Sequence, residues 1–200
     1  MMTFKSVICT SVLALTLIPS AALAHTAGGE TSGFVHGLAH PVSGLDHILA
    51  MVMVGLFAHQ LGGRAMGLVP TTFVLVMAVG GALGVAGINI PFVEIGIALS
   101  VVVFGATVAL GAKAPTMVAM GIVGLFAVFH GHAHGVEVPK NAGVLAYAAG
   151  FIIATAILHS VGIGIGFLIG KIGEQYGSGV VRASGGVAAV AGVGILAGIL

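Results

Sequence analysis

Long apolar segments, separated by short polar breaks, follow one another along almost the whole chain. After the first 24 residues there are six such segments of roughly 20 residues or more, and a helix needs about 20 residues to cross a hydrocarbon core of about 30 Å. The breaks between them contain Gly, Pro, Asn or a charged residue, which commonly end helices. The pattern therefore predicts six transmembrane helices, near residues 43–61, 66–87, 91–112, 115–135, 142–170 and 179–200.

The first 24 residues have the order of a secretory signal peptide. Lys5 supplies a basic start, an apolar stretch follows, and Ala22-Leu23-Ala24 has the small-x-small form of a cleavage site. We expect cleavage after residue 24, so that the mature chain begins at His25; an uncleaved signal anchor is the alternative. The predicted organisation is a signal peptide at 1–24 and a single six-helix transmembrane domain at 25–200.

The basic residues test the orientation that cleavage implies. A cleaved leader leaves the new N-terminus outside, and the loops must then alternate between the two sides. Four of the five basic residues of the mature chain fall inside in this arrangement, which agrees with the positive-inside rule. They are Arg64, Lys113, Lys171 and Arg182, whereas Lys140 falls outside.

The composition supports an all-α integral membrane protein. Hydrophobic residues make up 58% of the chain and charged residues 6%, with a mean hydropathy of +1.23, whereas about a quarter of the residues of a soluble domain are charged. The one cysteine, Cys9, lies in the predicted leader, so the mature chain has no disulfide and no thiolate metal site. A net charge of +1 gives no reason to expect nucleic acid as a partner.

Four side chains of metal-ligand type, His36, His40, Asp46 and His47, stand at the start of the first predicted span. Ionisable groups in or beside hydrocarbon are costly, so they indicate function by default. We expect Pro41 at the first helical position, with His40 and His47 on one face. Asp46 would act as a ligand or orient an imidazole, and a structural hydrogen-bonded pair is the alternative reading of Asp46 with His47.

A second group, with His130, His132, His134 and Glu137, stands at the outer end of the fourth predicted span. In a helix, His130 and His134 share a face and His132 points away. The glycines between these histidines would allow an extended segment that places all three imidazoles on one side. The pattern predicts a metal site, and an exposed, weakly binding histidine loop is the alternative.

Four more residues are weaker candidates. His159 lies deep in the fifth span and is either a ligand or an ordinary hydrogen-bonded core residue. Glu94, one turn into the third span, could neutralise a cation, and His25 would combine an imidazole with a free α-amine. His59, beside an inner loop, has the position for an exit role; the simpler reading is an ordinary polar residue at the membrane interface.

The ligand types point to a borderline divalent transition metal. Imidazole suits nickel, cobalt, copper, zinc and iron, while calcium and magnesium prefer oxygen ligands, and the lack of thiolate disfavours copper(I) and structural zinc. Nickel and cobalt fit best. The sequence has no phosphate-binding loop and no HExxH motif, which argues against ATP hydrolysis on this chain and against intramembrane metalloproteolysis. We therefore expect a transport protein and no enzyme.

Two motifs carry a resemblance to a known family. His40-Pro41-x-x-Gly44-x-Asp46-His47 and Phe129-His130-Gly131-x-Ala133-His134-Gly135-x-Glu137 resemble those of the HupE/UreJ family of bacterial nickel permeases. The resemblance implies a six-span inner (plasma) membrane protein, here with a periplasmic N-terminus, that takes up nickel, or cobalt in some members, for hydrogenase or urease maturation. Carried over to this sequence, the implied functional residues are His40, Asp46, His47, His130, His134 and Glu137.

The sequence thus predicts uptake of Ni²⁺, with Co²⁺ as the other candidate, through an external entrance of His, Asp and Glu side chains, without a tightly bound cofactor. Two other functions stay open: a haem-binding electron-transfer subunit with axial ligands such as His47, His130 and His159, and a metal-sensing membrane partner that does not transport. The expected partners are the metal ion, the lipid bilayer and a downstream hydrogenase or urease maturation system. A homo-oligomer is compatible with the sequence.

Overall fold

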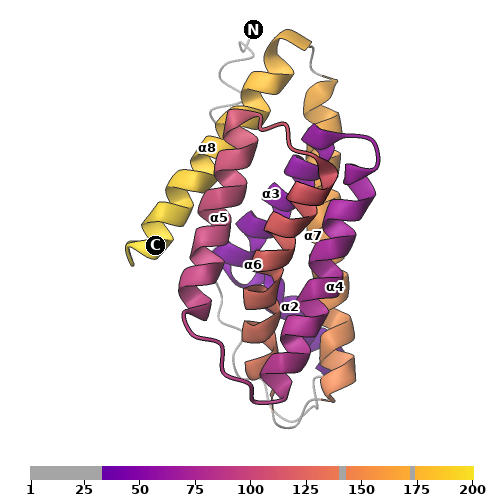
Figure 1. Ribbon diagram of the computed structural model, residues 1–200, viewed down its shortest axis with the longest axis vertical. Coiled ribbons are helices and arrows are strands. Elements are labelled where there is room, and N and C mark those ends of the chain that lie inside the picture. Colours follow the sequence, from indigo (N-terminus) through magenta and orange to yellow (C-terminus); the bar gives the residue numbers. More distant parts are fainter. Residues whose placement is uncertain (1–32, 140–142, 172–173) are drawn as a thin grey trace, which may run out of the picture. The chain divides into compact units, whose positions relative to one another are not determined.

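The computed structural model describes residues 33–139, 143–171 and 174–200, which are helical and contain no strand (Figure 1). The predicted signal peptide and His25 lie outside these residues. A short helix and a 3₁₀ turn precede six long helices. In chain order the elements are α2 (Gly33–Ala39), η1 (His40–Val42), α3 (Leu45–Leu61), α4 (Ala65–Val85), α5 (Val93–Leu110), α6 (Thr116–Val136), α7 (Val144–Gly170) and α8 (Glu174–Leu196).

Each predicted span corresponds to one long helix, and the helical membrane character is confirmed. Five of the helices, α4 to α8, are long and apolar enough to cross a membrane. The number is six if the pair formed by Gly33–Val42 and Leu45–Leu61 counts as one broken span. Successive helices run in opposite directions, so that α4 and α6 end where α5 and α7 begin (Figure 1). We call this the histidine end, because His40 and His134 lie there.

The start of the first span differs from the prediction. Pro41 belongs to the turn η1, and α3 begins only at Leu45, after a bend of 78°. Gly44 lies at the break, where its backbone is extended and the Asp46 carboxylate folds back over it, 2.7 Å from where a Cβ would be. The expectation of one continuous helix with His40 and His47 on a common face is therefore wrong, and the helix α2 was not predicted.

The second motif is a regular helix. Helix α6 continues without interruption to Val136, so the extended alternative for its three histidines is wrong. Gly131 and Gly135 serve close packing instead of unwinding, because a side chain on either one would overlap the α4 backbone at Met77 or Gly81. Small residues at such crossings let membrane helices approach closely. The α4–α6 contact thereby fixes the directions of the neighbouring histidines.

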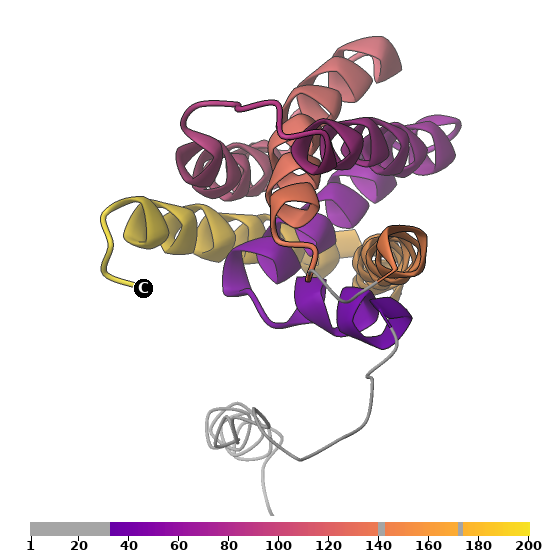
Figure 2. The ribbon, with the colours of Figure 1, turned by 90° about the horizontal axis from the view of Figure 1, so that it is seen from below.

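Helix α3 packs against several other helices, chiefly α7, α5 and α4. Gly55 of α3 and Gly162 of α7 face each other without room for a side chain on either. Figure 2 looks at the histidine end, where α2 lies beside the start of α7, while α8 lies beside α5. The buried core between the helices is apolar and includes Met51, Phe57, Phe73 and Phe104. Polar side chains that enter this core are few, and most of the fully buried ones are histidines.

Candidate metal site

The histidine end carries a compact group of three ligand-type side chains. His40 of η1 lies with its Nε2 2.8 Å from Oε2 of Glu137, which follows α6 directly. His134, in the last turn of α6, completes the group, and one ligand atom from each of the three residues lies within 4.8 Å of the others. His40 and Glu137 are partly exposed, with 29% and 53% of their side chains accessible, whereas His134 is buried. The group can therefore receive a cation from solvent.

Local structure explains this arrangement. His134 and Glu137 are three residues apart, which places them on neighbouring positions of the same helical face. They also stand at the C-terminal end of α6, where unpaired carbonyls and the helix dipole favour a positive charge. The buried Pro41 holds the turn η1 and so brings His40 over them.

The second pair, Asp46 and His47, lies in the first turn of α3. Oδ1 of Asp46 accepts a hydrogen bond from the His47 backbone N–H at 2.7 Å and another from His47 Nδ1 at 3.0 Å. A carboxylate only accepts, so Nδ1 carries the proton and Nε2 carries a lone pair. This Nε2 is buried and has no hydrogen-bond partner. Carboxylates orient metal-binding histidines in the same manner.

His130 lies one helical turn before His134 on α6 and is fully buried. Its Nε2 is 2.8 Å from the hydroxyl of Ser100 on α5, and its Nδ1 is buried without a partner. Neither nitrogen of His134 has a hydrogen-bond partner. Buried polar atoms normally find partners, so three neighbouring imidazoles with free nitrogens are an unusual concentration of unused ligand atoms.

These imidazoles form a continuous row from the surface to the core. The ring centroid of His40 lies 5.0 Å from that of His134, the next step to His47 is 4.7 Å, and the step from His47 to His130 is 4.8 Å. The structure thus joins both predicted motifs. We call His40, His134, His47 and His130 the histidine row.

An aromatic ring follows the inner end of the histidine row. The Phe73 ring lies 5.5 Å from His130 on one side and 5.1 Å from His159 on the other, measured between centroids. His159 is buried, and neither of its nitrogens has a hydrogen-bond partner. The alternative reading of His159 as a hydrogen-bonded core residue is therefore not supported by a partner in the described part of the chain.

Other predicted residues lie outside the row. His36 is exposed, with its ring 6.3 Å from that of His40. His132 points to another side of α6 and donates from Nε2 to the carbonyl of Ile88 at 2.7 Å. Glu94 is exposed in the first turn of α5. His59 lies at the far end of α3, edge-on to Phe167, beside a cavity of about 380 Å³.

Besides Phe73, three residues that the sequence did not single out lie against the row. Ser100 binds His130, Phe151 stacks on His134 with 5.0 Å between ring centroids, and Tyr147 lies about 6 Å from His40 with its buried hydroxyl unpartnered. No local pattern marks these residues, because each acts on a histidine that is remote in the sequence. Only the helix packing reveals them.

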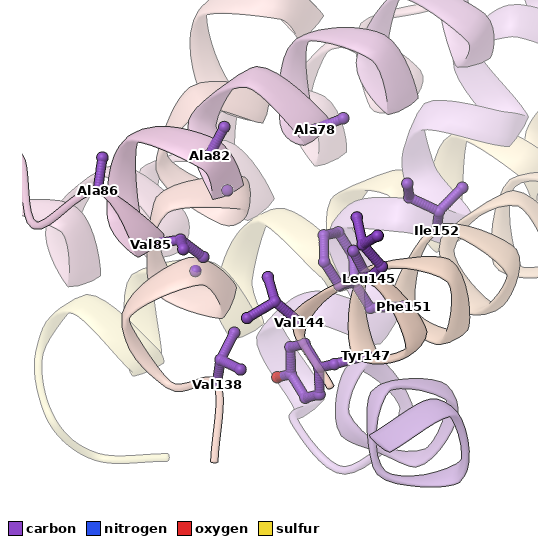
Figure 3. Close-up of a pocket in the computed structure, with 13 residues that line it drawn as sticks. Ala78, Ala82, Val85, Ala86, Val138, Val144, Leu145, Tyr147, Phe151 and Ile152 are labelled. Carbon is purple, nitrogen blue, oxygen red and sulfur yellow. The ribbon is translucent and has the colours of Figure 1, made fainter. Parts of the chain in front are cut away.

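An apolar pocket lies next to this site, between α4, α6 and α7 (Figure 3). It has a volume of about 360 Å³, and the Tyr147 hydroxyl is the one side-chain polar group on its lining. Such a wall offers almost no ligands for a cation. The nitrogen ligands are instead on the histidine row, which the Tyr147 and Phe151 rings approach, and the carboxylates of Asp46 and Glu137 contact that row.

The charges around the row favour a cation. The two acidic side chains that contact it are those of Asp46, beside His47, and Glu137, beside His40. Four basic residues of the described segments lie toward the opposite ends of the helices, namely Arg64, Lys113, Lys171 and Arg182.

The chain has clear relatives among known proteins. A family model described as "HupE / UreJ protein" matches residues 13–195. Protein HupE of Rhizobium leguminosarum bv. viciae is 50% identical over 190 residues, which cover 94% of this chain and 97% of that protein. No solved structure matches the chain.

Proposed function

The chain belongs to the HupE/UreJ family of permease-type membrane accessory proteins, which are not enzymes, and from this premise we propose that it imports a divalent transition-metal ion. The family is associated with nickel or cobalt uptake for hydrogenase and urease, and we propose Ni²⁺ as the principal substrate and Co²⁺ as the second. The observation that carries the proposal is the histidine row, which runs from a partly exposed imidazole to a fully buried one.

Capture takes place at His40, His134 and Glu137. The ion takes the place of the hydrogen bond between His40 and Glu137, whose proton leaves to solvent, and it takes a nitrogen of His134 as a further ligand. One carboxylate and two imidazoles are a ligand set that suits nickel and cobalt better than calcium or magnesium. The partial exposure of His40 and Glu137 lets water leave the ion stepwise during this exchange.

Transfer inward uses the rest of the row. A bare divalent ion cannot enter an apolar core without a large desolvation cost. Successive imidazoles with ring centroids 4.7 to 5.0 Å apart offer a new ligand before the previous one is released. Asp46 supplies negative charge at the α3 N-terminus, which would otherwise repel a cation. His159, beyond the Phe73 ring, is the next ligand inward, and His59 lies toward the exit.

The remaining candidates have supporting positions in this scheme. His36 lies beside the entrance, Glu94 adds a negative charge at the same end, and His25 belongs to the mature N-terminus before α2. His132 is a weaker ligand candidate, because its Nε2 proton is engaged by the Ile88 carbonyl.

The topology that fits this scheme places the histidine end in the periplasm. We propose that residues 1–24 are a cleaved signal peptide and that residues 25–200 form one six-span domain in the inner membrane. In it, α2, η1 and α3 make a single broken span. Broken helices with polar groups at the break are suited to ion sites within membranes.

The deciding experiment measures nickel accumulation in cells that lack other nickel importers. Wild-type protein should raise cellular nickel, and His47→Ala or Asp46→Ala should abolish this at normal expression. Unchanged accumulation in either variant would reject the proposed route. Flux into proteoliposomes distinguishes transport from sensing, because a sensor binds the metal without delivering it to the lumen.

The haem alternative is not favoured. The rings of His47 and His130 have centroids 4.8 Å apart, which leaves no room for a macrocycle between them as axial ligands. Purified protein without a Soret band would agree with this conclusion.

A further inference from the structure

Ser100 makes two hydrogen bonds with a single proton. Its hydroxyl oxygen lies 2.6 Å from the carbonyl oxygen of Ile97 and 2.8 Å from Nε2 of His130. A carbonyl oxygen has no proton to give, so the Ser100 hydroxyl donates to Ile97 and the second bond must run from His130 to Ser100. Nε2 of His130 therefore carries the proton.

The consequence for His130 is a fixed tautomer. A neutral imidazole has one N–H and one lone pair, so Nδ1 of His130 carries the lone pair, and this atom is buried without a partner. His47 is fixed in the complementary way, since its Nδ1–H donates to the Asp46 carboxylate and the lone pair of the neutral ring stays on Nε2. Two adjacent imidazoles, held by two different residues, each keep one unused ligand atom.

We propose that His47 and His130 form an inner cation site, distinct from the outer group of His40, His134 and Glu137, and that Ser100 is the positioning residue of that inner site. The inference rests on the proposed function and assigns to the inner site the same class of substrate, a borderline divalent transition-metal ion. His134 lies between the two sites and can serve either one, because both of its nitrogens are free.

The contact of Ser100 with a histidine sets it apart from comparable residues. Thr107 and Ser184 also bond to a carbonyl three residues earlier in their own helices, at 2.8 and 2.7 Å. Among the side-chain hydroxyls of the described segments, only that of Ser100 has a recorded bond to an imidazole nitrogen. A residue that merely satisfied its own helix would not fix the proton of a buried ring on another helix.

The test begins with the proton itself. Metal-free protein labelled with ¹⁵N-histidine gives separate signals for protonated and unprotonated ring nitrogens in solid-state NMR, and His130→Gln identifies the His130 signals. We expect His130 to be protonated at Nε2 in the wild type and to lose this preference in Ser100→Ala. A wild-type spectrum with the proton on Nδ1 overturns the proposal, even if Ser100→Ala does not fold.

Nickel binding supplies the second readout. Titration of wild-type protein in detergent with Ni²⁺ should show two classes of site. Loss of an orienting partner typically lowers metal affinity by about 10- to 100-fold, and Ser100→Ala should weaken the inner class by this amount without changing the outer one. Ser100→Thr retains the hydroxyl and should restore binding, while Ser184→Ala is the matched control and should bind as the wild type does.

The outcomes separate this inference from the proposed function. If wild-type protein neither binds nor transports Ni²⁺, both the inner site and the proposed uptake function are rejected. Wild-type protein that transports Ni²⁺ through a single class of site overturns the inner site, and a Ser100→Ala variant with wild-type affinity overturns the positioning role of Ser100. Either result leaves uptake through the outer group intact.

Discussion

His40 and Glu137 are 97 positions apart in the sequence, yet Nε2 of the one lies 2.8 Å from Oε2 of the other. The contact joins the turn before α3 to the end of α6, and thus links the two halves of the site. Both side chains are partly exposed, so the contact itself adds little to stability. Because it lies at the mouth of the histidine row, we expect it to matter for uptake instead.

The first prediction concerns this pair. His40→Ala and Glu137→Gln should each lower nickel uptake at limiting Ni²⁺, and the double variant should be little worse than either single one, because residues that act on one ion are not additive. Uptake assays at matched expression measure this. Lys113→Gln, at the other end of the helices, is the control for loss of a charge. Additive losses would show that the two residues act on separate steps.

A second prediction separates the role of Asp46 in uptake from its role in the helix. Asp46→Asn keeps an acceptor at the start of α3 but removes the negative charge. The loss of an acid from a first turn costs about 0.3–1 kcal/mol, so we expect a small fall in thermal stability. Uptake should nevertheless be lost, since the ion at His47 would have no neighbouring charge. Normal uptake by this variant would make Asp46 a helix-capping residue only.

A third prediction uses two glycines of α6 as a matched pair. Gly131→Ala should destabilise the protein and abolish uptake, because the new methyl group overlaps the Met77 backbone and pushes α4 away from the histidines. Gly121→Ala is on the same helix, faces open space, and should stabilise it by roughly 0.5–1 kcal/mol through helix propensity. Thermal unfolding in detergent measures both. Equal behaviour of the two variants would mean that the close α4–α6 contact does not position the site.

The long apolar segments and the polar breaks between them were enough to predict the long helices, since a span requires a length that few other elements reach. The bend before α3 was not predicted, because a glycine such as Gly44 is tolerated within a helix as well as at a break. Similarly, the two motifs indicated the ligand types of the site. Ser100 and Phe73 gave no signal, since their roles arise from contacts between helices.

A fourth prediction tests whether the pathway continues past Phe73. His159 has no hydrogen bond to lose, so His159→Leu, of similar volume and without a ligand atom, should fold normally. We expect nickel binding at the histidine row to be unchanged and flux into proteoliposomes to fall, because the inward ligand is missing. A lumenal nickel-sensitive dye measures the flux. Wild-type flux in this variant would assign His159 to the core alone.

The last prediction concerns the choice of metal. A ligand that binds only the folded state stabilises it by about 2.7 kcal/mol at a concentration 100 times its dissociation constant. Ni²⁺ and Co²⁺ should therefore raise the unfolding temperature of purified protein, and a chelator should reverse the shift. Mg²⁺ and Ca²⁺ should produce no comparable shift, because they prefer oxygen ligands, and a site made of imidazoles with one carboxylate at each group offers too few. A shift with Mg²⁺ as large as that with Ni²⁺ would instead indicate nonspecific binding to the exposed Glu137. In that case Glu137→Gln would remove the stabilisation by Ni²⁺ and by Mg²⁺ alike.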